Sequence, residues 1–235
     1  MSEHSKVAIV TGGGRGMGAA IARELHGEGY KLALMSPSGS AQELAKELVG
    51  VGVTGGCEDP QALEELVAKT MEAYGRIDSV VIHTGGPPKG ELLDIPDEDW
   101  IKGLDLVLLS VVRLCRLVTP VMERQGGGSI VNITAAFALQ PDIRFPVSST
   151  LRAGLSAFTK LYSDRYAKAN IRMNSVMPGY IDSLSFPDEY KLENPMQRIG
   201  TVHEIAKTVA FLLSDGAGFI TGQNIPVDGG QVRRP

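Results

Sequence analysis

The fold of this chain is decided by one stretch, Val7-Ala8-Ile9-Val10-Thr11-Gly12-Gly13-Gly14-Arg15-Gly16-Met17-Gly18. Its first residues are apolar and mostly β-branched, which is typical of a strand buried in a parallel sheet. A glycine-rich turn follows, and then Ala20, Ile21 and Leu25 recur at helical spacing. A strand, such a turn and a helix in this order form a cradle in which backbone N–H groups and the helix dipole bind a pyrophosphate. The stretch therefore predicts a dinucleotide-binding α/β fold.

Short apolar runs alternate with longer helical segments along the rest of the chain. The expected strands are Val7–Val10, Lys31–Met35, Val51–Thr54, Ser79–His83, Ser129–Thr134, Arg172–Val176 and Asn224–Val227. The expected helices are Gly16–Gly27, Ala41–Leu48, Gln61–Tyr74, Asp97–Arg124, Val147–Lys168 and Val202–Ser214. This alternation predicts one Rossmann-type domain over residues 1–235, in which a doubly wound, parallel, seven-stranded sheet carries helices on both faces. The polar, proline-flanked segment Ser183–Pro195 is the expected lid.

The composition argues against several classes of partner. The 235 residues carry a net charge of −4, which gives no electrostatic reason to expect nucleic acid or an anionic membrane. No apolar run approaches the roughly 20 residues that span a bilayer, and the polar start Met1–Lys6 does not read as a signal peptide. Cys57 and Cys115 lack the spacing of a metal site. We expect a cytoplasmic protein without a metal, whose partner is a small molecule.

The residues after the second expected strand indicate which nucleotide would bind. NAD-specific members of this fold place an acidic residue there, which binds the ribose 2′-OH. This chain has Met35-Ser36-Pro37-Ser38-Gly39-Ser40 instead, and Arg15 adds a cation within the glycine turn. Hydroxyls and a cation favour a 2′-phosphate, so the sequence predicts NADP(H) rather than NAD(H). Ser36 and Ser38 are also compatible with an ordinary polar loop.

Several motifs resemble those of the short-chain dehydrogenase/reductase family, in particular its 3-oxoacyl-ACP reductases. Thr11–Gly18 matches the TGxxxGxG turn, and His83–Gly86 stands where the family has Asn-Asn-Ala-Gly. Ile171–Gly179 is close to IRVNxVxPG, and Phe219–Gly230 nearly reproduces the C-terminal signature. The resemblance covers nearly the whole chain and implies a homotetramer and a set of cofactor-binding residues. They are Gly12, Gly14, Arg15, Gly16, Met17, Gly18, Ser36, Ser38, Cys57, His83, Gly85, Arg152, Pro178, Gly179, Ile181 and Ser183.

The family's catalytic residues are an Asn, a Ser, a Tyr and a Lys, and the resemblance places different residues at these positions. The flanking segments Ala153–Leu155 and Phe158–Lys160 match the family's AGLxxFTK and fix the register. In this register Ser148 stands at the Tyr position and Arg152 at the Lys position. The usual proton donor to a substrate oxygen is therefore missing.

Few polar side chains could replace the missing catalytic groups. Ala135 and Val107 stand at the Ser and Asn positions and offer no polar side-chain atom. Ser148 and Arg152 share one helix face at i and i+4, and an arginine can hold a ribose or a carboxylate but releases no proton at neutral pH. Thr134 could bond a substrate oxygen if its loop shifts by one residue. Ser148, Arg152 and Thr134 are therefore the candidate catalytic residues.

Other polar residues near these positions have alternative interpretations. Ser149 or Asp142 could also bond a substrate oxygen. His83 could shuttle a proton near neutral pH, although its place after the fourth strand indicates contact with the adenosine. Arg144, together with Arg152, suggests an anionic group in the substrate, unless Arg144 is simply solvated in its loop.

Three functions are compatible with this site. The first, which we prefer, is a divergent NADP(H)-dependent oxidoreductase of a small carbonyl or alcohol, because a general acid contributes only ~10²–10⁴-fold to the rate. The second is a catalytically inactive, cofactor-binding pseudoenzyme that serves as a sensor, scaffold or partner subunit. The third is a lyase or dehalogenase. Dehalogenating relatives carry an Arg where Arg152 stands, but they keep the Ser and Tyr and lose the glycine turn.

Two long helices give a physical reason for the expected homotetramer. Asp97–Arg124 and Val147–Lys168 carry more apolar positions than one sheet face can cover. These positions are Leu104, Val107, Leu108, Val111, Val112, Leu151, Leu155 and Phe158. The surplus is expected to pack against a symmetry mate.

Overall fold

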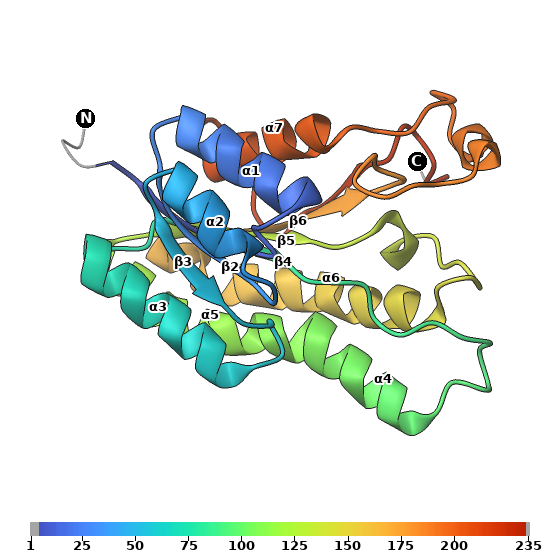
Figure 1. Cartoon of the computed structure of the whole chain (residues 1–235), viewed down its shortest axis with the longest axis horizontal. Coiled ribbons are helices and arrows are strands. Elements are labelled where there is room, and N and C mark those ends of the chain that lie inside the picture. The colour runs from blue at the N-terminus through green and yellow to red at the C-terminus, as the bar shows by residue number, and fades with distance from the viewer. Residues whose placement is uncertain (1–4, 234–235) are drawn as a thin grey trace.

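A seven-stranded parallel sheet organises the structure, a computed structural model that describes residues 5–233 (Figure 1). The strands are β1 (Val7–Thr11), β2 (Lys31–Ser36), β3 (Val51–Thr54), β4 (Ser79–His83), β5 (Gly128–Ile133), β6 (Ile171–Pro178) and β7 (Asn224–Val227). Their order is β3-β2-β1-β4-β5-β6-β7, so the direction of winding reverses between β1 and β4. Ligands of such sheets bind at the carboxyl ends of the strands beside this reversal. The expected parallel, seven-stranded sheet is confirmed.

Helices cover both faces of the sheet, as the sequence predicts. They are α1 (Gly16–Gly27), α2 (Ser40–Glu47), α3 (Pro60–Tyr74), α4 (Asp97–Leu104), α5 (Ser110–Gln125), α6 (Pro146–Tyr166) and α7 (Val202–Leu213). Helices α1, α2 and α7 lie on one face, and α3, α5 and α6 lie on the other (Figure 1). Within residues 5–233, no helix is both long and apolar enough to cross a membrane.

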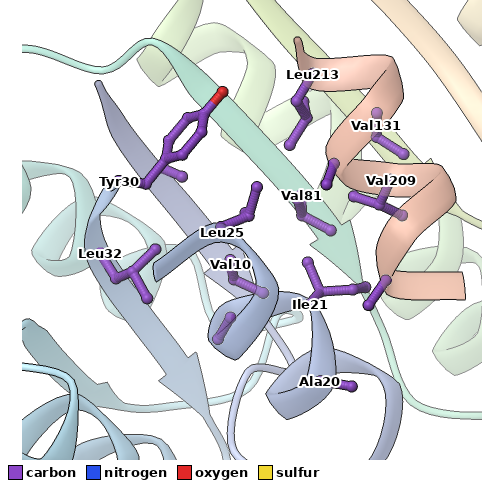
Figure 2. Close-up of a cluster of buried hydrophobic side chains, with 14 of the residues drawn as sticks. Val10, Ala20, Ile21, Leu25, Tyr30, Leu32, Val81, Val131, Val209 and Leu213 are labelled. Atoms are coloured by element: carbon purple, nitrogen blue, oxygen red, sulfur yellow. The ribbon is translucent and has the colours of Figure 1, made fainter. Parts of the chain in front are cut away.

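The core between α1 and α7 shows why the expected amphipathic pattern of α1 is needed. Ile21 and Leu25 are fully buried and face α7, whose Val209 and Leu213 are covered in turn (Figure 2). Val10 of β1 lies beneath them (Figure 2). Burying each such side chain stabilises the fold by about 1.5–3 kcal/mol. This packing fixes the start of α1 against the carboxyl end of β1.

The expected helix Asp97–Arg124 is wrong in one respect, because it is not a continuous α-helix. A π-helical turn, Asp105–Leu109, separates α4 from α5. Apolar residues continue through the turn, and a single wide turn does not interrupt a hydrophobic pattern read from sequence. Val107, at the family's Asn position, lies within this turn and is fully buried.

Some of the apolar side chains that were expected to need a symmetry mate are already buried within this chain. Val107, Val111 and Leu155 are buried in the core beneath α5 and α6, so they need no symmetry mate. Five of the named positions are only half-buried. They are Leu104, Leu108, Val112, Leu151 and Phe158.

Strand β7 forms one edge of the sheet, and its proline faces outward. The carbonyl oxygens of Gln223 and Val227 accept hydrogen bonds from β6 and the residue that follows it. Backbone groups of alternate residues in a strand point to opposite sides, so Pro226 turns its nitrogen toward the open edge. A proline has no N–H to offer a further strand.

Candidate cofactor and active site

The glycine turn after β1 needs its glycines for conformation and for packing. Gly12 and Gly16 have φ of +61° and +51°, in the left-handed region that glycine adopts without strain. A Cβ at Gly18 would lie 2.0 Å from the carbonyl oxygen of Gly12, so α1 can approach the turn only if Gly18 has no side chain. The turn is therefore held close against the first turn of α1.

The N-terminus of α1 is open to an anion. Arg15 is the N-cap residue, makes no side-chain capping bond and is exposed, and the first helical turn has no acidic residue. Ser183, at the start of the expected lid, lies beside this terminus, where a Cβ at Gly16 would be 3.0 Å from its Cβ. Uncapped N–H groups at a helix start bind phosphate. Gly16, Arg15 and Ser183 thus come together as the sequence predicts.

A cluster of hydroxyls lies beside the glycine turn at the end of β2. The hydroxyl of Ser36 donates to the Ser38 carbonyl oxygen (2.6 Å) and accepts from the Ala41 N–H (3.1 Å). The hydroxyls of Ser38 and Ser40 are 2.9 Å apart. Ser40 was not among the predicted site residues, yet its Oγ would lie 2.1 Å from a Cβ at Gly14. The sequence did contain a signal for Ser40, because it continues the alternate serines Ser36 and Ser38 up to the start of α2.

Beside Cys57, one of the expected cofactor-binding residues, lies a carboxylate that the sequence reasoning missed. A Cβ at Gly56 would lie 2.3 Å from Oε1 of Glu58, so this acidic side chain folds over the glycine. Cys57 between them is buried, and burial raises its thiol pKa to about 11. Its sulfur lies 3.8 Å from the His83 carbonyl oxygen.

His83 is neutral at pH 7 in this structure. Burial lowers the pKa of its imidazole to about 4, and the nearby Arg152 charge adds to the effect. Its Nδ1 is buried and has no hydrogen-bond partner among the described residues. Desolvation of the charged ring therefore disfavours the alternative in which His83 shuttles a proton near neutral pH. Its backbone is tied to Thr11 by hydrogen bonds of 3.0 and 3.1 Å.

Arg152 joins α6 to the end of β5 and to the segment that follows β4. Its side chain donates from Nε to Ser148 Oγ (3.2 Å), from Nη1 to the Ile133 carbonyl oxygen (3.0 Å) and from Nη2 to the Gly85 carbonyl oxygen (3.4 Å). The residue is only 6% exposed, and burial lowers its pKa to about 10. The predicted i, i+4 pair of Ser148 and Arg152 is thus formed, with an arginine that remains charged at pH 7.

The other candidates for a substrate contact are occupied or apolar. Thr134 is buried, and its hydroxyl donates to the Val176 carbonyl oxygen (3.2 Å). The Ser149 hydroxyl is also buried and accepts from the Asp142 N–H (3.2 Å). Ala135 is half-buried directly before a short 3₁₀ turn. The Ser148 hydroxyl differs from that of Thr134. It is half-buried, and it donates to no carbonyl oxygen of the described residues.

Arg144 is neither free for a substrate anion nor simply solvated. Its guanidinium binds Glu193 through Nη1–Oε1 (2.8 Å) and Nη2–Oε2 (2.9 Å), and Asp142 through Nε–Oδ1 (2.9 Å). Tyr180 donates its hydroxyl hydrogen to Glu193 Oε2 (2.8 Å) and accepts from Arg144 (3.0 Å). The ring of Tyr190 lies 5.0 Å from the guanidinium carbon. We call Asp142, Arg144, Tyr180 and Glu193 the clasp, because they tie the expected lid to the loop before α6.

The segment after β6 completes the cofactor side of the site. Pro178 ends β6 and is buried, as is Ile181. A Cβ at Gly179 would lie 2.9 Å from the Cα of Asp228, so the glycine allows the C-terminal loop to approach. The chain then passes through Ser183 toward the clasp.

Comparison with known proteins shows the family of the chain. The family model described as enoyl-(acyl carrier protein) reductase matches residues 12–231. The 7alpha-hydroxysteroid dehydrogenase of Bacteroides fragilis is 33% identical over 96% of this chain and 94% of its own length. The 3-oxoacyl-[acyl-carrier-protein] reductase of Chlamydia trachomatis is 32% identical over 97% and 98% of the two chains.

A solved structure shares the fold over the same extent. The L-sorbose reductase of Gluconobacter frateurii, in complex with NADPH and L-sorbose, superposes with a TM-score of 0.92 at 26% identity, over 100% of this chain and 99% of its own. The relatives named here are oxidoreductases, and they align with this chain almost from end to end. This chain belongs to the short-chain dehydrogenase/reductase family.

Proposed function

We propose that the protein is an NADP(H)-dependent oxidoreductase that acts on a small molecule with a proton-donor arrangement unlike that of its family. One observation carries the proposal. The phosphate cradle is complete, and a charged, buried Arg152 hydrogen-bonded to a half-buried Ser148 lies where the resemblance places the family's Lys and Tyr. The relatives that match this chain are reductases and dehydrogenases, and one of them was solved with NADPH.

The residues present fit such a dinucleotide. The turn Gly12–Gly18 and the open start of α1 suit a pyrophosphate. Arg15 with Ser38 and Ser40 suits a 2′-phosphate, since no described carboxylate pairs with Arg15. Glu58 suits the adenine amine, because a carboxylate accepts hydrogen bonds. When bound, the nicotinamide supplies or accepts a hydride.

Ser148 and Arg152 supply a charge-assisted hydrogen bond to the substrate rather than a ready proton. Because Ser148 Oγ accepts from Arg152, its own hydrogen is directed toward another acceptor. A hydroxyl polarised by a guanidinium donates a strong, charge-assisted hydrogen bond. Neither group releases its proton readily at pH 7, so water provides the proton that completes a reduction.

A second candidate function is a cofactor-binding pseudoenzyme. Ala135 and Val107 favour it, because they leave two family positions without a hydrogen-bond donor. Thr134 does not fill the gap, since its hydroxyl is bound to a backbone carbonyl.

Two measurements separate these functions. Thermal unfolding with NADPH and with NADH tests binding, because a ligand of the native state raises the melting temperature. We expect a larger rise with NADPH, and no rise with either nucleotide would remove both functions. Oxidation of NADPH is then followed against a panel of carbonyl compounds with wild-type protein and Ser148→Ala. Binding without turnover of any compound would favour the pseudoenzyme.

We further propose that the protein is a homotetramer in which α5 and α6 meet the same helices of another copy. A groove of about 490 Å³ runs between these helices and is lined by Cys115, Phe158 and Tyr162 among others. Leu161 on its rim is 68% exposed. Apolar side chains left open to water in this way favour burial against a partner.

A further inference from the structure

We infer that Ser148 and Arg152 form a binding site for a carboxylate, so that the substrate of the oxidoreductase is a carboxylic acid in its anionic form. The assignment of this anion as a substrate rests on the proposed function. The site itself rests on the charge, burial and hydrogen bonding of two side chains.

The charge of Arg152 has no counter-ion among residues 5–233. Its three hydrogen-bond acceptors are a hydroxyl and two backbone carbonyl oxygens. No carboxylate of residues 5–233 lies within 4.0 Å of it, whereas Arg76, Arg113 and Arg144 each pair with an aspartate. Burying an unpaired charge costs several kcal/mol. An anion bound nearby would recover part of this cost.

Arg172 is a second arginine without a carboxylate within 4.0 Å among the described residues, and its hydrogen bonds indicate a structural role. Its guanidinium donates to the carbonyl oxygens of Leu212 and Ser214 at 2.8 and 3.1 Å. These carbonyls belong to the C-terminal end of α7, where the helix dipole is negative and stabilises a cation. The carbonyls that Arg152 meets follow β4 and end β5, so no helix dipole offsets its charge.

Ser148 gives an anion access to this charge. Ser148 is half-buried in the first turn of α6, and its oxygen accepts from Arg152 Nε, which leaves its hydrogen without an acceptor among the described residues. The same helical turn contains no acidic residue, and Phe145 at the N-cap makes no side-chain capping bond. A negatively charged oxygen would therefore meet a donor hydrogen, a buried cation and the positive end of a helix.

Open space lies at Gly85 and Gly86, next to the Arg152 side of this pair. A Cβ added at Gly85 or Gly86 would meet no atom within 4 Å, although Gly85 itself contacts Arg152 through its carbonyl oxygen. Both glycines are exposed. Ser148 contributes a single hydroxyl hydrogen, which suits one oxygen of a singly charged carboxylate better than the several oxygens of a phosphate.

The test compares a carboxylate with its neutral amide in the absence of nucleotide. Acetate and acetamide are titrated at constant ionic strength, and binding is followed by saturation transfer to their methyl protons. The proteins are wild type, Ser148→Ala and Arg152→Met. Thr150→Ala and Arg165→Met are matched controls, because both side chains are exposed on the same helix.

We expect acetate to bind wild type and both controls, and acetamide to bind none of them. Either site variant should weaken acetate binding at least about tenfold, the effect of losing a hydrogen bond to a charged group. Ser148→Ala keeps the packing of Arg152, so it decides the matter if Arg152→Met fails to fold. Equal binding of acetate and acetamide, acetate binding unchanged by Ser148→Ala, or tighter binding of inorganic phosphate would each overturn the inference.

The same proteins distinguish this inference from the proposed function. A rise in melting temperature with NADPH but no acetate binding would remove the carboxylate site and leave the oxidoreductase. Acetate binding at Ser148 without any response to NADPH would keep the anion site and remove the oxidoreductase.

Discussion

At the scale of single residues, the site is shaped by one buried cation and one neutral histidine. Arg152 is charged at pH 7 because even in its buried position its pKa falls only to about 10. The pKa of His83 falls to about 4, mainly through burial and further through the Arg152 charge. Sequence reasoning placed both residues near the cofactor but could not show these protonation states, because they depend on burial and on a contact between distant segments.

The depressed pKa of His83 makes the protein less stable in mild acid. The unfolded chain takes up a proton on this residue near pH 6.5, whereas the folded chain does so near pH 4. Stability is therefore complete above pH 6.5 and is lost as pH falls from 6.5 to 4, by about 3 kcal/mol in all. Urea unfolding of wild type and His83→Gln across this range measures how the free energy of unfolding depends on pH. The same pH dependence in both proteins would contradict the prediction.

At the scale of elements, the clasp connects the expected lid, residues 183–195, to the loop before α6. Its ion pairs are only partly exposed, with 37% of the Arg144 side chain and 31% of the Glu193 side chain open to solvent. The sequence indicated a lid at Ser183–Pro195 from its composition, but the pairing of Arg144 with Glu193 joins segments far apart in the chain and left no local pattern. The π turn at Asp105–Leu109 was not predicted from the sequence either, because one wide turn leaves the spacing of apolar residues almost unchanged.

Breaking the clasp should release the lid. Glu193→Gln removes a charge that binds Arg144 twice and accepts from Tyr180. We expect cleavage within residues 183–195 by a low concentration of protease to become several-fold faster, because the lid would open more often. Glu189→Gln is the control, since Glu189 is exposed in the same 3₁₀ segment and forms no ion pair within the described part of the chain. Equal cleavage of both variants would show that the aromatic contacts alone hold the lid.

The packing of α1 on α7 gives a second prediction at this scale. Leu25 is fully buried in this core, so Leu25→Ala should lower the free energy of unfolding by about 2–5 kcal/mol. Denaturant unfolding measures the loss. Leu192→Ala serves as the control, because that side chain is 73% exposed and should change stability little. A loss below 1 kcal/mol for Leu25→Ala would mean that this core tolerates the cavity.

At the scale of the whole molecule, the fold followed from the sequence and the catalytic site followed only in part. The alternation of strands and helices predicted the parallel sheet, because burial on both faces imposes apolar runs that are visible residue by residue. The motif register correctly brought Ser148 and Arg152 together. The hydrogen bond that occupies Thr134 and the Glu58 carboxylate over Gly56 depend on backbone paths that no motif specified.

Assembly is the property of the whole molecule that remains a prediction. If copies meet through α5 and α6, Leu161→Asp should place charges within that two-fold contact and split the tetramer into dimers. Light scattering should then fall from four times to twice the chain mass of 25.0 kDa, because a second contact holds each dimer together. Leu192→Asp, on an exposed position of the lid, should leave the mass unchanged. A wild-type mass of 25.0 kDa would reject the tetramer directly.

Pro226 has a consequence for the behaviour of the protein at high concentration. An edge strand can recruit strands of neighbouring molecules and so begin fibrous aggregation. At the β7 edge the outward-facing nitrogen of Pro226 has no hydrogen, so a continuing ladder would lack a rung in the middle of a strand that spans only Asn224–Val227. The same edge that completes the sheet therefore protects concentrated protein from growing into filaments.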